Sequence, residues 1–510
     1  MKIPELLAML LYFTGVIAVG IYFFIRNKQK GGSEKEYFLG GRQMNGWVSA
    51  LSAGASDMSA WVLMGLPGSI YMYGMGQLWI AIGLLLGTIA AWIFVAPPLR
   101  RYSIVAKDSI TIPQFLTNRF LTERKGILVI SALVFMITYC IYAASSIYAC
   151  GTLFNTVLGV DPRIAMVIAS LVIVLYTFLG GFNAVCWTDF FQGLLMLGAL
   201  MLAPILAVCM MNSASFVAPA CTIPENYYNF FSSGKLDWKS ISDIISGMGW
   251  GLGYFGMPHI LVRFIAVRDE KEMKKSQIIA CAWIFIILSM SCVVALVGRR
   301  FLGDSLMEGA DSRTLVFINM VRSVFEWIGS SLGIMTVAVF LAGILLSAIL
   351  AASMSTADSQ LLASASAFAS DMYKPLFRKN ASDKEMLWAG RVVVIVIALA
   401  AYLIASSPKC GGIMALVECA WAAFGASFGP AILLGLYWKR LTYVGAAASI
   451  AVGFLTDAVW FIWLKDITGI YEIVPAFACG LITAVIVSLC TAKPAQEVLD
   501  LFEKSRNKMD

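Results

Sequence analysis

The sequence predicts an all-α polytopic membrane protein with about thirteen transmembrane helices, and three observations support this fold class. Of the 510 residues, 60% are hydrophobic and only 13% are charged, whereas soluble domains are about half apolar and a quarter charged. Many apolar stretches are long enough to cross the hydrocarbon core, which takes about 20 helical residues. The two longest polar segments, near 213–240 and 299–331, are too short for a soluble catalytic domain.

The thirteen apolar stretches follow one another with short connections along the whole chain. They lie near 6–25, 46–70, 75–98, 126–156, 161–181, 188–212, 241–266, 277–298, 332–370, 387–406, 411–437, 441–463 and 470–491. The first is followed by a basic run at 26–30 where a cleavage site would be expected, so it is a retained span and not a signal peptide. The stretch 332–370 is too long for one straight span.

Basic residues lie mostly on one side of the predicted bundle. With the N-terminus outside, roughly three quarters of the 37 Lys and Arg residues fall in cytoplasmic segments. The positive-inside rule and the odd number of spans therefore predict an outside N-terminus and a cytoplasmic C-terminus. We interpret the basic clusters as determinants of topology and not as a nucleic-acid site.

Several catalytic and energy-coupling motifs do not occur in the sequence. His259 is the single histidine, which excludes a zinc site with several histidine ligands. One G-x-S-x-G occurs at 425–429, but it lies inside an apolar span and not at the strand-to-helix turn of a hydrolase. No Walker phosphate-binding motif occurs. A membrane bundle without a motor is predicted to be a secondary transporter, with a channel and an enzyme as less favoured classes.

Two of the predicted spans, the second and the seventh, carry glycines and prolines that interrupt a helix. The first break contains Asp57 and Trp61 and closes with Gly-Leu-Pro-Gly at 65–68. The second break is 247–258, where alternating glycines weaken the helix and Pro258 removes a hydrogen bond. Paired breaks in corresponding spans are typical of transporters whose unwound backbone binds the ligand. Close helix packing through small residues is the alternative explanation.

The positions of the breaks predict two five-helix repeats of opposite orientation, because five is an odd number of spans. The first repeat covers 46–212 and the second covers 241–437, with an extracytoplasmic loop at 213–240 between them. Residues 1–45 are expected to form an extra N-terminal helix and the first cytoplasmic loop. Residues 438–510 are expected to form the last two helices and a cytoplasmic tail.

A polar face on the ninth span indicates a sodium site. Ser355 and Thr356 are adjacent, and Ala352 places its carbonyl one turn before Thr356. Sodium is a hard cation and should prefer oxygen ligands. Two hydroxyls and a carbonyl here can combine with carbonyls of the first break, near Ala55 and Met58. In the alternative explanation, the hydroxyls only bond back to carbonyls of their own helix.

Acidic residues inside spans are costly, so they mark candidate functional positions. Asp57 lies in the first break, and the others are Asp189, Asp358, Glu418 and Asp457. For Asp189 and Asp358, the alternative explanation is that their side chains simply face a cytoplasmic vestibule.

Around these residues the chain resembles the sodium/solute symporter family, and within it the branch that carries proline into bacteria. The resemblance extends from about residue 37 to 480, and its motifs lie at 38–42, 52–59, 64–68, 180–182, 187–189, 249–256 and 343–350. It implies thirteen helices with a leucine-transporter-like inverted five-helix repeat. It also implies secondary transport instead of an enzymatic reaction, and a place in the bacterial cytoplasmic membrane.

The resemblance assigns an ion site and a gate to matching positions of this chain. One co-transported sodium is expected on the carbonyls of Ala55, Met58 and Ala352 and the hydroxyls of Ser355 and Thr356. Asp57 is expected to be essential for sodium coupling, and Arg42 is expected in a cytoplasmic gate. Some relatives carry a second sodium at the positions of Asp189 and Ser359, and whether this chain does is left open.

The resemblance also assigns the substrate contacts. They fall on Ser59, Ala60, Trp61, Tyr142, Trp250, Tyr254 and Pro258. Three positions depart from the pattern of the proline-transporting branch: Ala60 stands for Gly, Met257 for Gln and Glu418 for Ser. The added methyl group of Ala60 bears on affinity more than on substrate identity, and Glu418 bears on ion dependence.

The chemistry of the two breaks suits proline. Aromatic walls can cover its ring, backbone carbonyls or an aromatic face can bind its ammonium, and amide groups at a half-helix N-terminus can bind its carboxylate. A sugar symporter should show several Asn, Gln and Glu residues in the breaks. The expected partners are therefore L-proline, sodium and the lipid bilayer, with no nucleic acid and no obligate protein partner. The alternatives are a sodium symporter for another amino acid, a carboxylate or a sugar, a substrate-gated channel, and a transporter-like sensor.

Overall fold

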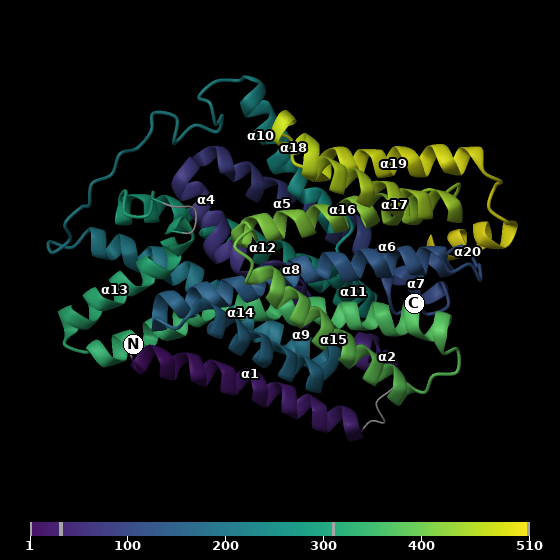
Figure 1. Cartoon of the computed structure of the whole chain (residues 1–510), viewed down its shortest axis with the longest axis horizontal. Helices are drawn as coiled ribbons and strands as arrows, with labels where there is room; N and C mark the ends of the chain where they lie inside the picture. The colour runs from purple at the N-terminus through teal and green to yellow at the C-terminus, as the bar shows by residue number, and fades with distance from the viewer. Residues whose placement is uncertain (1–2, 30–33, 309–311, 507–510) are drawn as a thin grey trace.

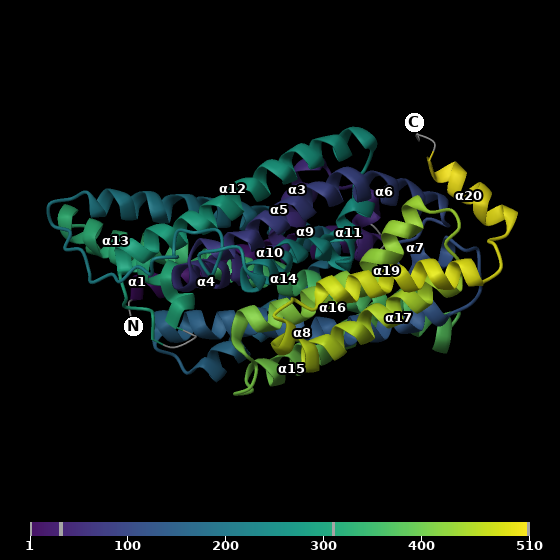
Figure 2. The same cartoon turned by 90° about the horizontal axis from the view of Figure 1, so that it is seen from above.

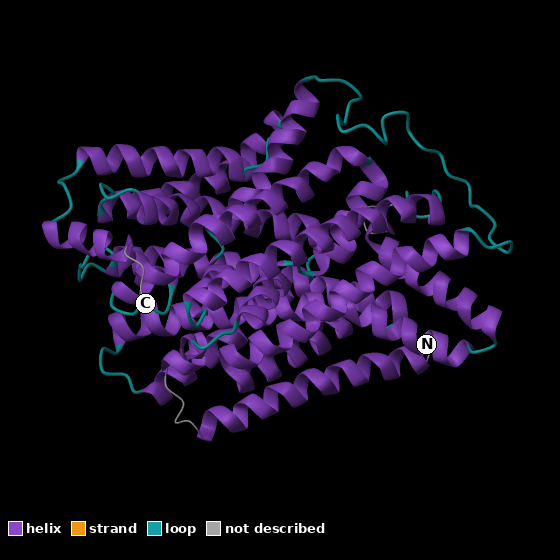
Figure 3. Cartoon of the chain, turned by 180° about the vertical axis from the view of Figure 1, so that it is seen from behind, coloured by secondary structure: helices purple, strands orange, loops and turns teal. Residues whose placement is uncertain are grey.

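The computed structural model describes residues 3–29, 34–308 and 312–506, and nearly all of these residues are helical (Figures 1 and 3). Within these ranges there is no strand, only one parallel bridge between Met44 and Val267. The all-α prediction is therefore confirmed. Residues 30–33 of the predicted first cytoplasmic loop and 507–510 of the predicted tail lie outside the described residues.

The helices follow one another from the N-terminus to the C-terminal tail. In chain order they are α1 (Ile3–Gln29), α2 (Glu34–Leu39), η1 (Gly40–Arg42), α3 (Gly46–Asp57), η2 (Trp61–Gly65), α4 (Leu66–Tyr73), η3 (Met75–Gln77), α5 (Leu78–Ala90), η4 (Ala91–Val95), α6 (Ala96–Val105), α7 (Ile112–Asn118), α8 (Gly126–Leu158), α9 (Pro162–Met211), α10 (Trp238–Gly249), η5 (Trp250–Phe255), α11 (Pro258–Ala266), α12 (Glu270–Leu302), η6 (Ser312–Leu315), α13 (Val316–Leu332), α14 (Met335–Ser366), η7 (Ala367–Phe377), α15 (Asp383–Ala405), α16 (Gly412–Tyr437), α17 (Tyr443–Val459), η8 (Trp460–Leu464), α18 (Lys465–Thr468), α19 (Ile473–Cys490) and α20 (Gln496–Arg506).

Ten helical stretches of the described chain are long and apolar enough to cross a membrane, and some of them include more than one of these elements. The other three predicted spans are also helical, but each is short or interrupted. The stretch 46–70 divides into α3, η2 and α4, and the stretch 241–266 divides into α10, η5 and α11. The stretch 161–181 begins with the shorter apolar helix Pro162–Leu175. The count of thirteen thus differs from ten because breaks shorten the regular helix.

Helix α9 joins the fifth and sixth predicted spans into one 50-residue element. Gly181 interrupts it with φ 62° and ψ −168°, a backbone conformation that residues with a side chain rarely adopt. A Cβ at this position would also press against the ring of Tyr37. Gly181 therefore lets the chain change direction between the two spans.

The predicted polar segment 299–331 contains a helix that the sequence analysis missed. Helix α13 has one apolar face, and Val316, Phe317, Val321 and Val324 on it are fully buried. This face packs on α14 and α12. This helix was not predicted because its apolar residues are interspersed with polar ones, as on an amphipathic helix, so the segment has no continuous apolar stretch.

The bundle has two distinct ends (Figures 1 and 2). We call one the loop end, because the N-terminus and the long segment 212–237 lie there. We call the other the tail end, because α20 lies there. On one flank α1 packs on α9 and α14, and on the other flank α17 packs on α19 and α16 (Figure 1). Helix α14 lies between them, with nearly all side chains from Ala342 to Ser366 buried.

Candidate ion and substrate site

The first helix break separates α3 from η2. Helix α3 ends at Asp57, and Met58 follows with φ −79° and ψ 71°, which is not helical. The amide of Ser59 turns back to the carbonyl of Asp57 at 2.9 Å, and the amide of Val62 bonds the carbonyl of Ser59 at 3.1 Å. The regular ladder is thus replaced by short-range turns. The backbone that the sequence assigned to ion binding lies at the end of a half-helix.

The second helix break separates α10 from α11. A 3₁₀ turn covers Trp250–Phe255, Met257 is extended, and α11 starts at Pro258. The glycines here allow close approach as well as weakening the helix, because a Cβ at Gly253 would overlap the indole nitrogen of Trp421. Both explanations of the glycine run, a helix break and close packing, therefore describe the same segment.

A hydrogen bond joins the two breaks directly. The hydroxyl of Tyr254 donates to Oδ2 of Asp57, and both residues are about 2% exposed. The other carboxylate oxygen of Asp57 has no hydrogen-bond partner among the described residues. A buried carboxylate with an unsatisfied oxygen is costly. Asp57 therefore has capacity to bind a further donor or cation.

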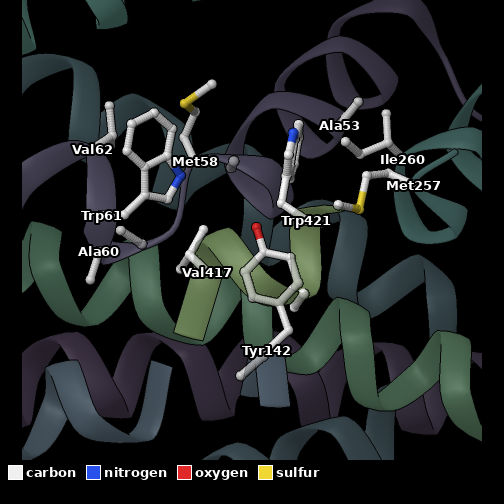
Figure 4. Packing of buried hydrophobic residues seen from close by; sticks show 14 of the residues in the cluster. Ala53, Met58, Ala60, Trp61, Val62, Tyr142, Met257, Ile260, Val417 and Trp421 are labelled. Carbon is white, nitrogen blue, oxygen red and sulfur yellow. The ribbon is translucent and has the colours of Figure 1, made fainter. Parts of the chain in front are cut away.

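Aromatic rings from three elements surround this link. The Trp61 and Trp250 rings are 6.0 Å apart, and Trp421 of α16 lies edge-on to Tyr254 at 5.1 Å. Figure 4 shows Trp61 and Trp421 on either side of Tyr142, whose hydroxyl points toward the space between them. That hydroxyl has no hydrogen-bond partner in the described part of the chain. The cluster offers aromatic faces and an unused polar atom to a small ligand.

The structure places all seven predicted substrate residues in the interior. Each of them is buried, and they are Ser59, Ala60, Trp61, Tyr142, Trp250, Tyr254 and Pro258. Pro258 also lines a narrow cavity whose walls include His259, Arg263 and Ser359. Trp421, which was not predicted from the sequence, also belongs to this cluster, because its indole nitrogen donates to the Trp250 carbonyl at 2.7 Å. A tryptophan in an apolar span gave no signal of that partner.

Four of the five predicted sodium ligands meet between α3 and α14. The hydroxyl of Ser355 bonds the carbonyl of Ala55 at 2.8 Å, although the two residues are 300 positions apart. Ser355 and Thr356 also bond the carbonyl of Ala352, at 3.2 and 3.1 Å. The bonds to Ala352 are those that a purely structural role predicts, whereas the bond to Ala55 crosses between helices. Met58, the fifth, is buried at the start of the first break, directly after α3.

The donor chemistry of this cluster fits sodium. Its atoms are carbonyl and hydroxyl oxygens without formal charge, and the residues are fully buried. Hydroxyl groups can rotate, so both can turn their lone pairs toward a cation. Hard monovalent and divalent cations take several such oxygens.

Asp189 and Ser359, the positions of a second sodium in some relatives, share a different partner here. The guanidinium of Arg263 bonds Asp189 at 2.8 Å and Ser359 at 2.5 Å, and it also bonds the hydroxyl of Ser52 at 2.8 Å. Arg263 and Asp189 side chains are 3% and 0% exposed. Arg263 is one of the basic residues that were assigned to the cytoplasmic side from the sequence, but its side chain lies inside the bundle in the structure. Only the pairing of α11 with α9 and α14 reveals this.

Arg42, the predicted gate residue, ties the first loop to other elements at the tail end. Its guanidinium bonds Asp108 at 2.9 Å, the Ser109 carbonyl at 2.7 Å and the Ile265 carbonyl of α11 at 2.9 Å. Burial lowers the pKa of Arg42, and the carboxylate of Asp108 opposes this shift. Arg42 thus connects the loop after α2 to the second half of the second broken helix.

Two facing helix breaks in a membrane bundle, with a cluster of neutral oxygen atoms beside them, are typical of an ion-coupled secondary transporter. The chain belongs to the sodium:solute symporter family, whose model matches residues 37–453. The predicted resemblance is thereby confirmed, and so are sodium as the co-transported ion and the absence of an enzymatic role. The bacterial relatives also support a multi-pass protein of the bacterial inner membrane.

Among similar proteins, the osmoregulated proline transporter OpuE of Bacillus subtilis is 39% identical over 507 residues, covering 98% of each chain. The high-affinity proline transporter PutP of Bacillus subtilis is 41% identical, covering 93% of this chain and 96% of the relative. A sodium/proline symporter of Haemophilus influenzae is 37% identical, covering 98% and 97%.

Solved transporter structures share the fold. A Na+-coupled sialic acid symporter superposes with a TM-score of 0.74 at 20% identity, covering 97% of this chain and 99% of that one. MhsT in complex with L-phenylalanine superposes with a TM-score of 0.55 at 13% identity, covering 88% and 98%. These likenesses confirm the predicted fold class of inverted-repeat transporters.

Proposed function

We infer that this chain is a sodium-coupled symporter that takes up L-proline by alternating access. The observation that carries the substrate is the series of relatives named for proline transport, 37–41% identical over nearly the whole chain. The chemistry of the site agrees, because the two breaks offer aromatic faces and polar backbone and lack a set of amide side chains for a sugar.

We propose that the ring of proline lies among Trp61, Tyr142, Trp250 and Tyr254, and that Ser59 and Pro258 complete the contact surface. The unused hydroxyl of Tyr142 supports this, because a buried polar atom without a partner gains a hydrogen bond when a ligand arrives. Ala60 lies in the same turn, so its methyl group narrows the site beside Trp61.

Sodium is proposed to bind the carbonyls of Ala55, Met58 and Ala352 and the hydroxyls of Ser355 and Thr356. An ion there fixes the end of α3, two residues before Asp57. Because Asp57 accepts a hydrogen bond from Tyr254, fixing α3 also orders the second break. Each ligand should therefore raise the affinity for the other by the same factor.

A second sodium at Asp189 and Ser359 stays a prediction, with one physical condition. Arg263 already bonds both side chains, so a sodium ion must displace the guanidinium or share the carboxylate with it. Two cations at one buried carboxylate repel each other strongly.

We further propose that the loop end faces outside and the tail end faces the cytoplasm. The distribution of basic residues supports this orientation, and it places both Arg42 and α20 on the cytoplasmic side. The repeats 46–212 and 241–437 are proposed as the two inverted halves. One break lies in the second predicted span and the other in the seventh, so each break lies in the first span of its repeat.

Uptake of labelled proline into proteoliposomes tests the function. A gradient of ten to one adds about 1.4 kcal/mol to the 2.3 kcal/mol that 100 mV supplies per charge, which sets a ceiling of several hundred-fold accumulation for one ion per proline. We expect accumulation that a sodium ionophore abolishes. Equal uptake from potassium medium would disprove sodium coupling, and equilibration without accumulation would indicate a channel. Competition by other amino acids, carboxylates or sugars would reveal another substrate.

A further inference from the structure

The segment between η8 and α19 covers the second break from the loop end. It runs from Lys465 to Glu472, and Figure 1 shows α18 beside α10 there. The ring of Tyr471 lies 5.2 Å from the ring of Trp250, and its amide donates to the hydroxyl of Ser246 at 3.0 Å. Tyr471 is 2% exposed. One wall of the proposed proline site is therefore backed by this segment.

An ion-pair cluster holds the segment in place. The ammonium of Lys465 lies 3.0 Å from a carboxylate oxygen of Glu418 on α16 and 3.0 Å from one of Glu472. Glu472 is fully buried, whereas Lys465 and Glu418 side chains are about a quarter exposed. The hydroxyl of Tyr471 donates to the backbone carbonyl of Glu418 at 2.8 Å. One ammonium thus ties together α16, α18 and the start of α19.

Lys465 is the cation that both carboxyl groups of the cluster contact. The carboxyl groups of Glu418 and Glu472 each lie 3.0 Å from its ammonium, and Glu472 is fully buried. Asp457 of α17, which is 4% exposed, lies in the same part of the bundle. Removing the ammonium would leave the buried carboxyl group of Glu472 without a counter-charge, which favours separation of the elements that carry the cluster.

The ring of Tyr471 connects this cluster to the site. Lys465 lies 5.6 Å from the Tyr471 ring, and the same ring packs against Trp250. On its other sides Trp250 meets Trp61 and Trp421. A shift of the segment would therefore change the support of Trp250 without touching the oxygen cluster at Ser355 and Thr356.

We propose that Tyr471 is a positioning residue for the Trp250 wall of the substrate site, and that Lys465 seats it by pairing with Glu418 and Glu472. The proposal rests on the proposed function, since it takes Trp250 as a wall of the proline site. It gives Glu418, one of the three departures from the pattern of the proline-transporting branch, a role in substrate affinity through Lys465. Loosening the cluster should release proline faster and leave sodium binding intact.

Lys465→Gln and Lys465→Arg form the first test pair in the full-length transporter. We expect Lys465→Gln to raise the proline KM about tenfold, because a partly buried charge pair is lost. The maximal uptake rate and the sodium affinity measured without proline should stay unchanged. Lys465→Arg should bring KM back close to the parent value. Lys409→Gln, which removes an exposed cation of the same loop end, serves as the matched control and should leave KM unchanged.

Tyr471→Leu and Tyr471→Phe form the second pair, and they decide the question if Lys465→Gln does not reach the membrane. The leucine variant loses the ring against Trp250 and should raise KM, whereas the phenylalanine variant keeps the ring and should raise it less. An unchanged KM in Tyr471→Leu would overturn the proposal. So would a fall in maximal rate at constant KM, or an equal loss of sodium affinity. If the parent protein takes up no proline, the proposed function fails instead, and that result is separate from any difference among variants.

Discussion

Two polar clusters lie about one turn apart on α14, and they differ in charge. At Ser355 and Thr356 the available atoms are neutral oxygens from α14 and α3. At Ser359 the protein supplies its own cation, because Arg263 bonds Ser359 and the carboxylate of Asp189. Desolvated neutral dipoles cost less than an unpaired buried carboxylate. The neutral cluster therefore carries no charge that needs to be balanced, whereas in the charged cluster Arg263 balances the carboxylate of Asp189.

Removing the internal cation should have the largest effect. Arg263→Met leaves the carboxylate of Asp189 unpaired in the bundle, so we expect a loss of about 3–5 kcal/mol in stability. Thermal unfolding of the purified protein in detergent measures this. Adding Asp189→Asn should recover most of the loss, because the buried charge is then gone.

The same unfolding measurement can be repeated at different sodium concentrations. If sodium replaces the guanidinium beside Asp189, raising its concentration should stabilise Arg263→Met more than the parent, and potassium should not. An Arg263→Met protein as stable as the parent would break the comparison, because Asp189 would then have another counter-charge.

Altering the neutral cluster should have an intermediate effect. Thr356→Ala removes one of the proposed oxygen ligands of sodium and keeps a small helical residue. The sodium concentration for half-maximal uptake should therefore rise about tenfold or more, as expected for one lost polar contact of about 1–3 kcal/mol. Stability without sodium should change little. Ser353→Ala is the matched control, because Ser353 is equally buried but contacts the Ile349 carbonyl of its own helix and Cys150 of α8, and neither of these is a proposed sodium ligand. Equal sodium dependence in the two variants would assign Thr356 to packing.

A half-exposed ion pair should have the smallest effect. Asp108 pairs with Arg42 at 2.9 Å and also contacts Lys35, but its side chain is 45% exposed. Asp108→Asn should cost less than about 1 kcal/mol, because solvent screens such pairs. Unfolding temperature and proline KM should both stay close to those of the parent. If Asp108→Asn lost as much stability as Arg263→Met, the difference in burial would not determine how much each of the two arginine ion pairs contributes.

The sequence predicts features that depend on local backbone chemistry. Glycines and Pro258 mark the second break because they change backbone conformation wherever they stand. Ser355 and Thr356 are predicted because helical spacing puts them beside the carbonyl of Ala352. The helix breaks and most of the oxygen cluster could therefore be placed before the structure was known.

Features that depend on the pairing of distant helices could not be predicted. The partners of Arg263 and Trp421 cannot be predicted from the sequence, because they appear only when α11 and α16 are placed against their neighbours. The Tyr471 segment lies far along the chain from Trp250 and has no repeat or motif that connects the two. Contacts of this kind follow from tertiary packing, which single-sequence periodicity does not contain.

The close contact at Gly253 decides where this transporter can evolve a new specificity. Side chains at Gly251, Gly253 or Gly256 would overlap the backbone or a ring of a neighbouring helix. We therefore expect variants at these positions to misfold, whatever their effect on substrate binding would have been. Ala60 in the first break already carries a Cβ. In random libraries and in natural evolution, substitutions that alter the substrate range should therefore occur in the first break, while the glycines of the second break stay unchanged.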